Sequence, residues 1–368
     1  MKILLCFGTR PEAIKMAPLF HELKKSSIFK VKVCVTAQHR KMLDQVLDFF
    51  EMVPDYDLNV MQPNQTLNGL SANILSKMDA VLNDAKPDLV LVHGDTTTST
   101  MVSLAAFHLG IKVGHVEAGL RTYNKKSPFP EELNRQLTSR IADFHFAPTQ
   151  KAVDNLIMEG VKKDAILVTG NTVVDALFLT LGKLNNGFTT TAIETLKNNI
   201  NFSKKIILVT GHRRESFGEG FENLCKALLE IAKNKEVELV YPVHLNPNVQ
   251  KTVFNMLSGI KNIHLIEPLD YPSFVWLMGK SSLIISDSGG IQEEAPSFNI
   301  PVLVTRETTE RDEGIIAGFS YLVGTNTSKI VKMANELLDS TLLKEDKLNP
   351  YGDGKASKRI VHFIKNIK

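Results

Sequence analysis

Cysteine is scarce in this chain of 368 residues, which contains only Cys6, Cys34 and Cys225. No two of them have the Cys-x-x-Cys spacing, and Cys6 and Cys34 lie within apolar runs. These features argue against a disulfide framework and favour a reducing compartment. We interpret the three residues as small buried hydrophobic side chains, with a catalytic thiol as the minor alternative.

A strong excess of charge of one sign is also missing, because the chain has 43 basic and 40 acidic side chains and a net charge of +3. This balance argues against a dedicated nucleic-acid-binding protein, which is usually far more basic. No run of about 18 apolar residues occurs, so no membrane-spanning helix is expected. The apolar start, residues 1–7, is too short for a secretory signal, and we predict a cytoplasmic protein.

Several well-known binding motifs are absent from the sequence. It contains no Gly-x-Gly-x-x-Gly, no Walker A loop, no His-Glu-x-x-His and no paired Cys-x-x-Cys. Interpretations based on NAD, a P-loop nucleotide or zinc therefore lose support, and we expect neither a metal nor another cofactor.

What the sequence does contain is a regular alternation of short apolar runs and longer segments with helical periodicity. This alternation predicts repeated βα units and parallel sheets, and the length suits two α/β domains of the doubly wound, Rossmann-like type. The break is expected near Gly170, and residues 357–368 are expected to form an amphipathic helix. The predicted strands are 2–7, 31–36, 89–92, 113–117, 144–147 and 166–168 in the first half, and 205–209, 238–243, 263–266, 283–286, 302–305 and 321–323 in the second.

The first predicted strand ends in a glycine turn that opens onto a helix behind Pro11. Arg10 and Lys15 flank the start of this helix. Helix N-termini attract anions, and added cations favour a phosphate or substrate site, with a solvated first turn as the alternative. In doubly wound sheets, ligands bind beyond the carboxyl ends of the strands, so residues just after strands carry the most information.

Carboxylates follow the next strands of the first half. Asp95 comes after the third strand and could simply cap the following helix. Glu117 ends an apolar strand, where burial suits an acid or base in proton transfer, and a structural pair with Arg121 is the alternative. Glu131 and Arg135 lie four residues apart on one helix face, where a surface ion pair is the simpler interpretation.

In the second half, His212, Arg213 and Arg214 follow a strand and form a cationic cluster suited to a diphosphate. Two glycines follow Ser288, so that backbone N–H groups can approach a phosphate closely. Further candidates for nucleotide contacts are Gly289, Gly290, Glu294, which could accept from ribose hydroxyls, and the charged loop that contains Arg311.

These residues together resemble the non-hydrolysing UDP-N-acetylglucosamine 2-epimerases of bacteria. The matching segments occur in the family's order and extend over nearly the whole chain: 7–18, 94–98, 115–122, 128–132, 170–175, 212–215 and 287–294.

The resemblance implies a GT-B-like fold with the active site in the cleft between two Rossmann-type domains, residues 1–170 and 171–350. A C-terminal helix within 351–368 would return to the first domain. It also implies a homodimer and a UDP-sugar substrate, with no redox cofactor and no nucleic-acid or membrane partner. The site residues it implies are Arg10, Lys15, Asp95, Glu117, Glu131 and His212, with Ser288, Gly289, Gly290, Glu294 and Arg311 in the nucleotide-binding set.

The activity it implies is inversion of carbon 2 by elimination and re-addition of UDP, which would supply an activated sugar for a surface polysaccharide. The alternatives are a hydrolysing epimerase, an epimerase of a modified UDP-sugar, a GT-B glycosyltransferase and a UDP-sugar sensor without turnover.

Overall fold

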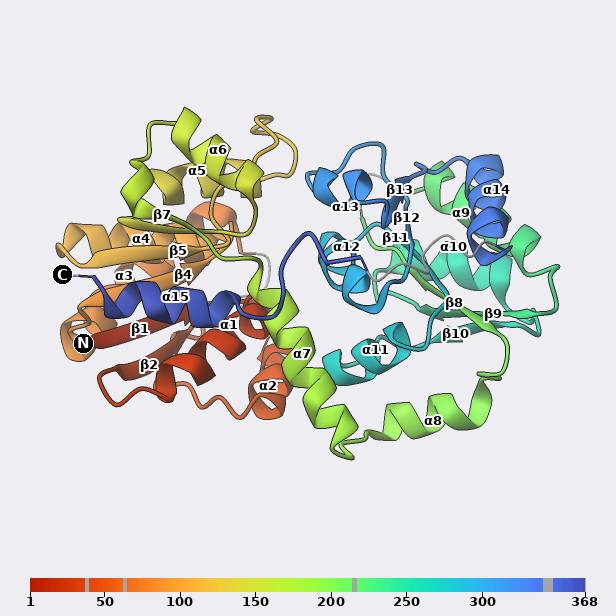
Figure 1. Ribbon diagram of the computed structural model, residues 1–368, viewed down its shortest axis with the longest axis horizontal. Coiled ribbons are helices and arrows are strands. Elements are labelled where there is room, and N and C mark those ends of the chain that lie inside the picture. Colours follow the sequence, from red (N-terminus) through yellow and green to blue (C-terminus); the bar gives the residue numbers. More distant parts are fainter. Residues whose placement is uncertain (37–39, 62–64, 214–216, 340–346, 368) are drawn as a thin grey trace. The chain divides into compact units, whose positions relative to one another are not determined.

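The computed structural model describes residues 1–36, 40–61, 65–213, 217–339 and 347–367. The chain divides into two compact units, each built on a parallel sheet (Figure 1). The first unit comprises Met1–Ala176 and Tyr351–Lys368, and the second comprises Leu177–Pro350. Helix α7 (Thr172–Asn185) starts in the first unit and ends in the second. The sequence-based break near Gly170 lies just before this helix.

The first unit contains a sheet of strand order β3-β2-β1-β4-β5-β6-β7 in the part of the chain that the structure describes. All neighbouring strands are parallel, and the order reverses direction between β1 and β4, as in doubly wound folds. The strands are β1 (Lys2–Phe7), β2 (Lys30–Val35), β3 (Tyr56–Asp57), β4 (Leu89–His93), β5 (Lys112–Val116), β6 (Phe144–Ala147) and β7 (Ile166–Val168).

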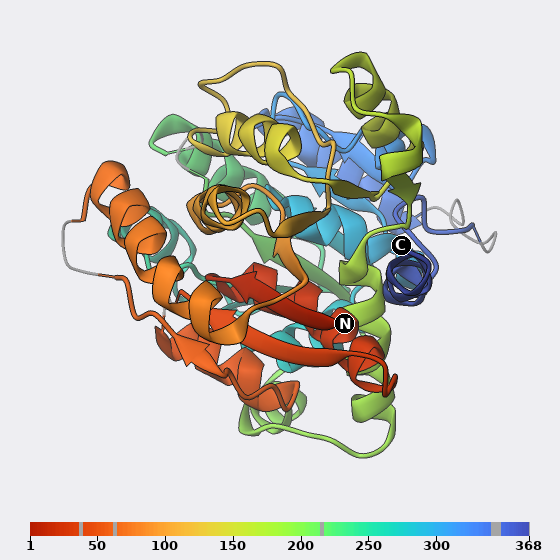
Figure 2. The same cartoon turned by 90° about the vertical axis from the view of Figure 1, so that its left-hand side faces the viewer.

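Helices cover both faces of this sheet, which explains why its central strands are almost uniformly apolar. Leu4 and Cys6 of β1 lie in the same core as Ile74 and Met78 of α3 and Val102 of α4. Figure 2 shows α3 and α15 on opposite sides of the sheet. The helical segments of the first unit in the described residues are α1 (Arg10–Lys24), α2 (Arg40–Phe49), α3 (Leu67–Ala85), α4 (Thr97–His108), α5 (Glu131–Ile141), α6 (Gln150–Met158), the 3₁₀ turn Lys163–Ala165 and α15 (Ala356–Lys365).

The second unit repeats the same plan, with the strand order β10-β9-β8-β11-β12-β13 among its described residues. Alternate residues of β8 enter two different cores: Ile207 and Val209 pack with α9, α10 and α14, whereas Ile206 and Leu208 pack with α8, α11 and α12. The strands are β8 (Lys205–Thr210), β9 (Val237–Pro242), β10 (Ile263–Ile266), β11 (Leu283–Ser286), β12 (Val302–Val304) and β13 (Ser320–Leu322). The helices are α8 (Thr191–Asn199), α9 (Glu219–Ile231), α10 (Pro247–Leu257), α11 (Tyr271–Met278), α12 (Gly289–Glu294), the 3₁₀ turn Ala295–Phe298, α13 (Asp312–Ile316) and α14 (Thr327–Asp339).

The C-terminal helix α15 belongs to the first unit and lies beside α1 (Figure 1). Its Phe363 packs edge-on against Phe144 and Phe146 of β6. Asp175 accepts hydrogen bonds from the backbone N–H groups of Ala356 (3.1 Å) and Ser357 (2.8 Å), which fixes the start of this helix.

The twelve predicted strands are confirmed with ends that shift by at most a residue, and the predicted C-terminal helix is confirmed as well. Among the strands of the described residues, β3 was missed, because two residues are too few to show a pattern. None of the helices in the described ranges combines the length and the apolar character that a membrane crossing requires.

Candidate functional site

The carboxyl ends of β1 and β4 meet at the point where the strand order of the first sheet reverses. Helix α1 begins there, because Thr9 caps it and the Glu12 carboxylate accepts from the Thr9 N–H (2.8 Å) in a capping box. The other oxygen of Glu12 accepts from the Thr96 hydroxyl (2.8 Å) at the start of α4. Burial raises the pKa of this carboxyl, although its hydrogen bonds oppose the shift. Glu12 therefore joins two strand-end loops, a structural role that the sequence did not reveal.

Arg10 and Lys15 both lie on α1, as the sequence predicts. Arg10 is the first residue of the helix and is partly buried, and this burial lowers the pKa of its guanidinium. Lys15 is buried one turn further on and forms an ion pair with Glu117. The first turn of α1 is therefore not simply a solvated helix end.

Glu117, the residue after β5, lies next to groups from three separate parts of the first unit. Besides Lys15 of α1, the Asn171 side-chain amide donates to its Oε2 (2.7 Å), and the Nε2 atom of His93 at the end of β4 lies 3.8 Å from the same oxygen. The backbone of Glu117 has φ = 61°, a left-handed conformation that is unusual for a residue with a long side chain.

The alternative pairing of Glu117 with Arg121 is wrong, since Arg121 donates to Glu159 through Nε (2.7 Å) and Nη2 (2.8 Å). The acid–base candidate is thus separate from the structural ion pair of the same loop.

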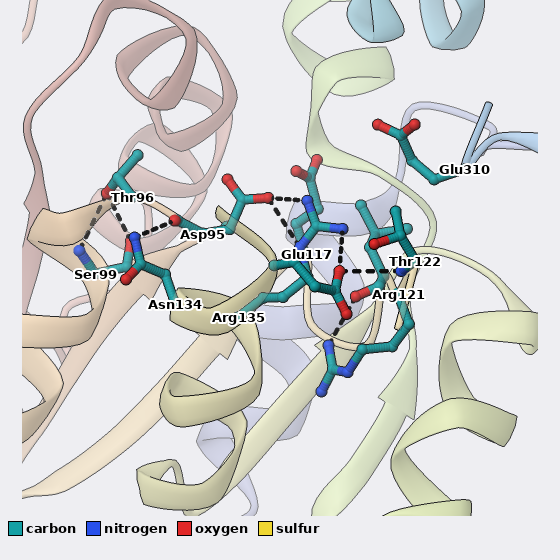
Figure 3. Close-up of polar contacts among 12 residues, drawn as sticks. Asp95, Thr96, Ser99, Glu117, Arg121, Thr122, Asn134, Arg135 and Glu310 are labelled. Carbon is teal, nitrogen blue, oxygen red and sulfur yellow. Dashed lines mark hydrogen bonds and ion pairs between the residues drawn. The ribbon is translucent and has the colours of Figure 1, made fainter. Parts of the chain in front are cut away.

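Asp95 lies beside Arg135, which donates to its Oδ2 from Nε (3.1 Å) and Nη2 (Figure 3). The backbone carbonyl of Asp95 accepts from the Asn134 amide (3.0 Å). The helix-cap interpretation of Asp95 is wrong, because Thr96 is the residue that caps α4. The side chain of Asp95 retains 26% exposure, so the carboxylate is held in place while still reached by solvent.

Glu131 and Arg135 differ from the predicted surface pair. Arg135 is buried and bridges Asp95 to Glu132, whose Oε2 it contacts at 3.3 Å. Glu132 is fully buried and also accepts from the backbone N–H groups of Thr122 and Tyr123 at 3.0 Å. Glu131 is the first residue of α5 and is half-buried, next to this network. Glu132 therefore has a scaffold role, and Glu131 remains the candidate for chemistry.

In the second unit, Asp287 organises the loop after β8. Its Oδ2 accepts from the backbone N–H groups of His212 and Arg213, both at 2.8 Å, and its Oδ1 lies 3.1 Å from Nδ1 of the His212 ring. Burial alone would raise the pKa of Asp287, but these hydrogen bonds and the His212 charge hold it below its ordinary value. The imidazole of His212 is 44% exposed and stacks on His244, so it is fixed and accessible. Arg214 and Glu215 lie outside the described residues.

The Ser288-Gly289-Gly290 segment starts α12 at the end of β11, as predicted. A Cβ atom at position 289 would lie 2.5 Å from Cζ of Arg311, so any residue other than glycine would force this guanidinium to move. Arg311 is buried and donates to Glu293 (2.9 Å) and to Glu310. Burial opposes ionisation of Glu310, but Arg311 and Arg306 hold its pKa well below the ordinary value. The predicted nucleotide-binding segment thus carries a fixed cation.

Glu294 is buried near the end of α12 and accepts the hydroxyl proton of Tyr271 at 2.6 Å. The predicted role of Glu294 as an acceptor for ribose hydroxyls stays a prediction. Tyr271 was not foreseen from the sequence, because an aromatic residue at a helix start has no spacing that links it to a carboxylate 23 residues away.

Comparison with known proteins places these features in a family. A family model described as UDP-N-acetylglucosamine 2-epimerase matches residues 21–365. A Salmonella typhimurium protein named UDP-N-acetylglucosamine 2-epimerase is 54% identical over 100% of this chain and 99% of its own length. The chain belongs to the UDP-N-acetylglucosamine 2-epimerase family.

Solved structures of UDP-N-acetylglucosamine 2-epimerases have the same fold over the full chain. The Neisseria meningitidis structure, described as bound to UDP-GlcNAc, is 53% identical, covers 100% of both chains and has a TM-score of 0.94. The Methanocaldococcus jannaschii structure, described as a complex with UDP-GlcNAc and UDP, is 33% identical, covers 99% of both chains and has a TM-score of 0.85.

Besides Glu12 and Tyr271, sequence reasoning missed three residues that shape the site in this UDP-N-acetylglucosamine 2-epimerase family member. His93 and Asn171 contact Glu117, and Asp287 holds the loop of His212. Each lies directly beside a strand or helix end, inside a segment that matches the family or adjoins one. Their position was a usable signal, but their partners depend on which strands are neighbours, and that order is not visible in a single sequence.

Proposed function

We propose that this chain interconverts UDP-N-acetylglucosamine and UDP-N-acetylmannosamine without net hydrolysis. The observation that carries the proposal is the ion-paired Glu117 in a left-handed conformation after β5, in the same unit as Asp95 and Glu131. The Glu117 side chain is only 8% exposed. The similarity to an epimerase structure bound to UDP-GlcNAc, over the whole of both chains, supports the same substrate.

Elimination followed by re-addition explains how carbon 2 can be inverted without oxidation. Carbon 2 is not next to a carbonyl, so its proton is not acidic enough for simple abstraction. In the proposed first step a base takes this proton, the C–H electron pair forms a double bond between carbons 1 and 2, and the bond to UDP breaks with its electrons on the diphosphate. UDP then adds back to carbon 1 while a proton reaches carbon 2 from the opposite face.

The residues of the first unit suit proton transfer and charge stabilisation. Glu117 is the first candidate for an acid or base, since a carboxylate held by Lys15 and Asn171 has a fixed orientation. Asp95 and Glu131 would stabilise the positive charge that develops at carbon 1 in an oxocarbenium-like transition state.

The residues of the second unit suit the departing diphosphate. His212 is fixed by Asp287 yet exposed, and Arg213 lies in the loop after β8. Arg311 lies just before α13, and its guanidinium donates to Glu293. The Ser288–Gly290 segment and Arg10 are further candidates for phosphate contacts. Charge-assisted hydrogen bonds from such groups stabilise the leaving group as the bond to carbon 1 breaks.

We further propose the cellular context that the family resemblance implies: a homodimer in the cytoplasm that supplies an activated sugar for a cell-surface polysaccharide. The exposed pair Leu133 and Leu137 on α5, 41% and 45% exposed, supports an association surface on the first unit.

Proton NMR in deuterated water tests the proposed reaction. Purified protein incubated with UDP-N-acetylglucosamine is expected to give UDP-N-acetylmannosamine that carries deuterium at carbon 2. Release of free N-acetylmannosamine and UDP would instead identify a hydrolysing enzyme. Binding of UDP without any turnover would favour a modified sugar or a sensor and would contradict the proposal.

A further inference from the structure

Asn171 joins the candidate acid–base residue to the place where the chain leaves and re-enters the first unit. Its side-chain Nδ2 donates to Glu117 Oε2 at 2.7 Å, while its Oδ1 accepts from the Val173 N–H at 3.0 Å in the first turn of α7. Its backbone N–H donates to the carbonyl of Tyr351 at 2.6 Å, where the chain returns. Asn171 is 2% exposed, so its polar groups form hydrogen bonds with the protein rather than with solvent.

The backbone around Asn171 is fixed by the close approach of two glycines. Gly170 has φ = 82°, and a Cβ at this position would lie 3.2 Å from the Cα of Gly352 and 3.4 Å from the Tyr351 carbonyl oxygen. Only glycine combines this conformation with such a close contact. The Asn171 side-chain amide therefore donates to Glu117 from a backbone segment that is fixed by its contacts with Tyr351 and Gly352.

The amide of Asn171 is chemically suited to orient a carboxylate. An N–H donor binds an ionised oxygen without adding charge, whereas Lys15 supplies the compensating positive charge to the same Oε2. Two donors from different elements restrict rotation of the carboxylate more than one ion pair does. Positioning of this kind matters because a displacement of about 1 Å can reduce a rate by roughly a hundredfold.

We propose that Asn171 is a positioning residue that holds the Glu117 carboxylate in its reactive orientation. This inference rests on the proposed catalytic role of Glu117. It goes beyond that role because it assigns a function to a residue that has no direct part in proton transfer.

The variant Asn171→Asp separates positioning from a purely structural role. Aspartate keeps an acceptor for the Val173 N–H and is a favoured residue at helix starts, but it removes the Nδ2 donor and adds a negative charge beside Glu117. Because a second carboxylate at this 2% exposed position is unfavourable, we expect a lower melting temperature. We also expect a KM for UDP-N-acetylglucosamine changed by less than about threefold and a kcat lower by roughly a hundredfold.

Asp175→Asn is the matched control, because it weakens the attachment of the segment by which the chain returns to the first unit (the return segment, from Tyr351 to Ser357). Asp175 fixes the start of α15 but is hydrogen-bonded to Ala356 and Ser357, not to Glu117. This variant is expected to melt at a lower temperature with little change in kcat. An equal loss of kcat in both variants would show that the return segment, rather than the amide of Asn171, controls the rate, and would overturn the proposal.

The double variant Glu117→Gln/Asn171→Asp provides a second test. If Asn171 acts only through Glu117, the double variant is no slower than Glu117→Gln alone, and additive losses would contradict this mechanism. A kcat for Asn171→Asp within about threefold of the unaltered value would also contradict the proposed positioning role of Asn171. Failure of the unaltered protein to exchange the carbon 2 proton would refute the proposed function instead, which keeps the two failures distinct.

Discussion

Glu117 combines an unfavourable backbone conformation with a favourable set of contacts. A left-handed conformation in a residue other than glycine costs on the order of 1–3 kcal/mol and persists only where the surroundings hold it. Here the surroundings are the ion pair to Lys15 and the hydrogen bond from Asn171. Strain of this kind is typical of residues whose side-chain direction is needed for chemistry.

Replacement of Glu117 by glutamine tests this interpretation by exchanging one carboxylate oxygen for an amide group. Glutamine retains the size of the side chain but can neither give nor accept the carbon 2 proton, so kcat is expected to fall by roughly a hundredfold or more. Single-turnover kinetics with UDP-N-acetylglucosamine would measure the loss. Glu159→Gln is the control, because Glu159 pairs with Arg121 on the same loop and is expected to affect stability rather than turnover. Near-normal turnover of Glu117→Gln would remove Glu117 from the mechanism.

At the scale of the strands, three buried histidines stand out at β4, β5 and β6. His115 and His145 are register neighbours, and His93 ends the adjacent strand. Burial lowers the pKa of His115 to about 3 and that of His93 and His145 to about 4. The three rings are therefore neutral in the folded protein at physiological pH.

These histidines predict an acid-sensitive first unit. Because their pKa in the unfolded chain is about 6.5, the unfolded state binds more protons between pH 6.5 and 4, and stability is lost as the pH falls through this range. Each histidine contributes at most about 1.4 kcal/mol per pH unit. His145→Gln is expected to give a shallower decline of the unfolding free energy, measured by urea denaturation at several pH values. An unchanged slope would show that His145 already binds a proton in the folded state.

The elements themselves were largely predictable, whereas their neighbours were not. Buried parallel strands such as residues 2–7 are continuous apolar runs, which a sequence reveals directly. The side chains at strand ends were also visible, since polar residues rarely follow such runs without reason. What the sequence could not supply was the pairing: Arg135 with Asp95, Arg121 with Glu159 and Asn171 with Glu117 each connect residues 38 to 54 positions apart.

At the scale of the whole molecule, the exposed side chains of α5 suggest where a second copy would bind. Leu133 and Leu137 lie four residues apart and therefore on one face of the helix. If they form part of a homodimer interface, Leu137→Glu would place a charge in an apolar contact and shift the protein to monomers. Light scattering coupled to size-exclusion chromatography would measure this change. A Leu137→Glu protein that remains dimeric would exclude this face of α5, and an unaltered protein that is monomeric would refute the predicted homodimer.

The near contact of Gly170 with Gly352 has a further consequence for how this architecture can evolve. Because the chain leaves the first unit and returns to it at adjacent points, the second unit is an insertion into a complete doubly wound domain. Insertions whose two ends meet are tolerated well, since they leave the order of the host strands unchanged. A different ligand-binding module could replace the inserted one by recombination after Ala176 and before Tyr351, which would leave Glu117 and its partner Asn171 in the host domain.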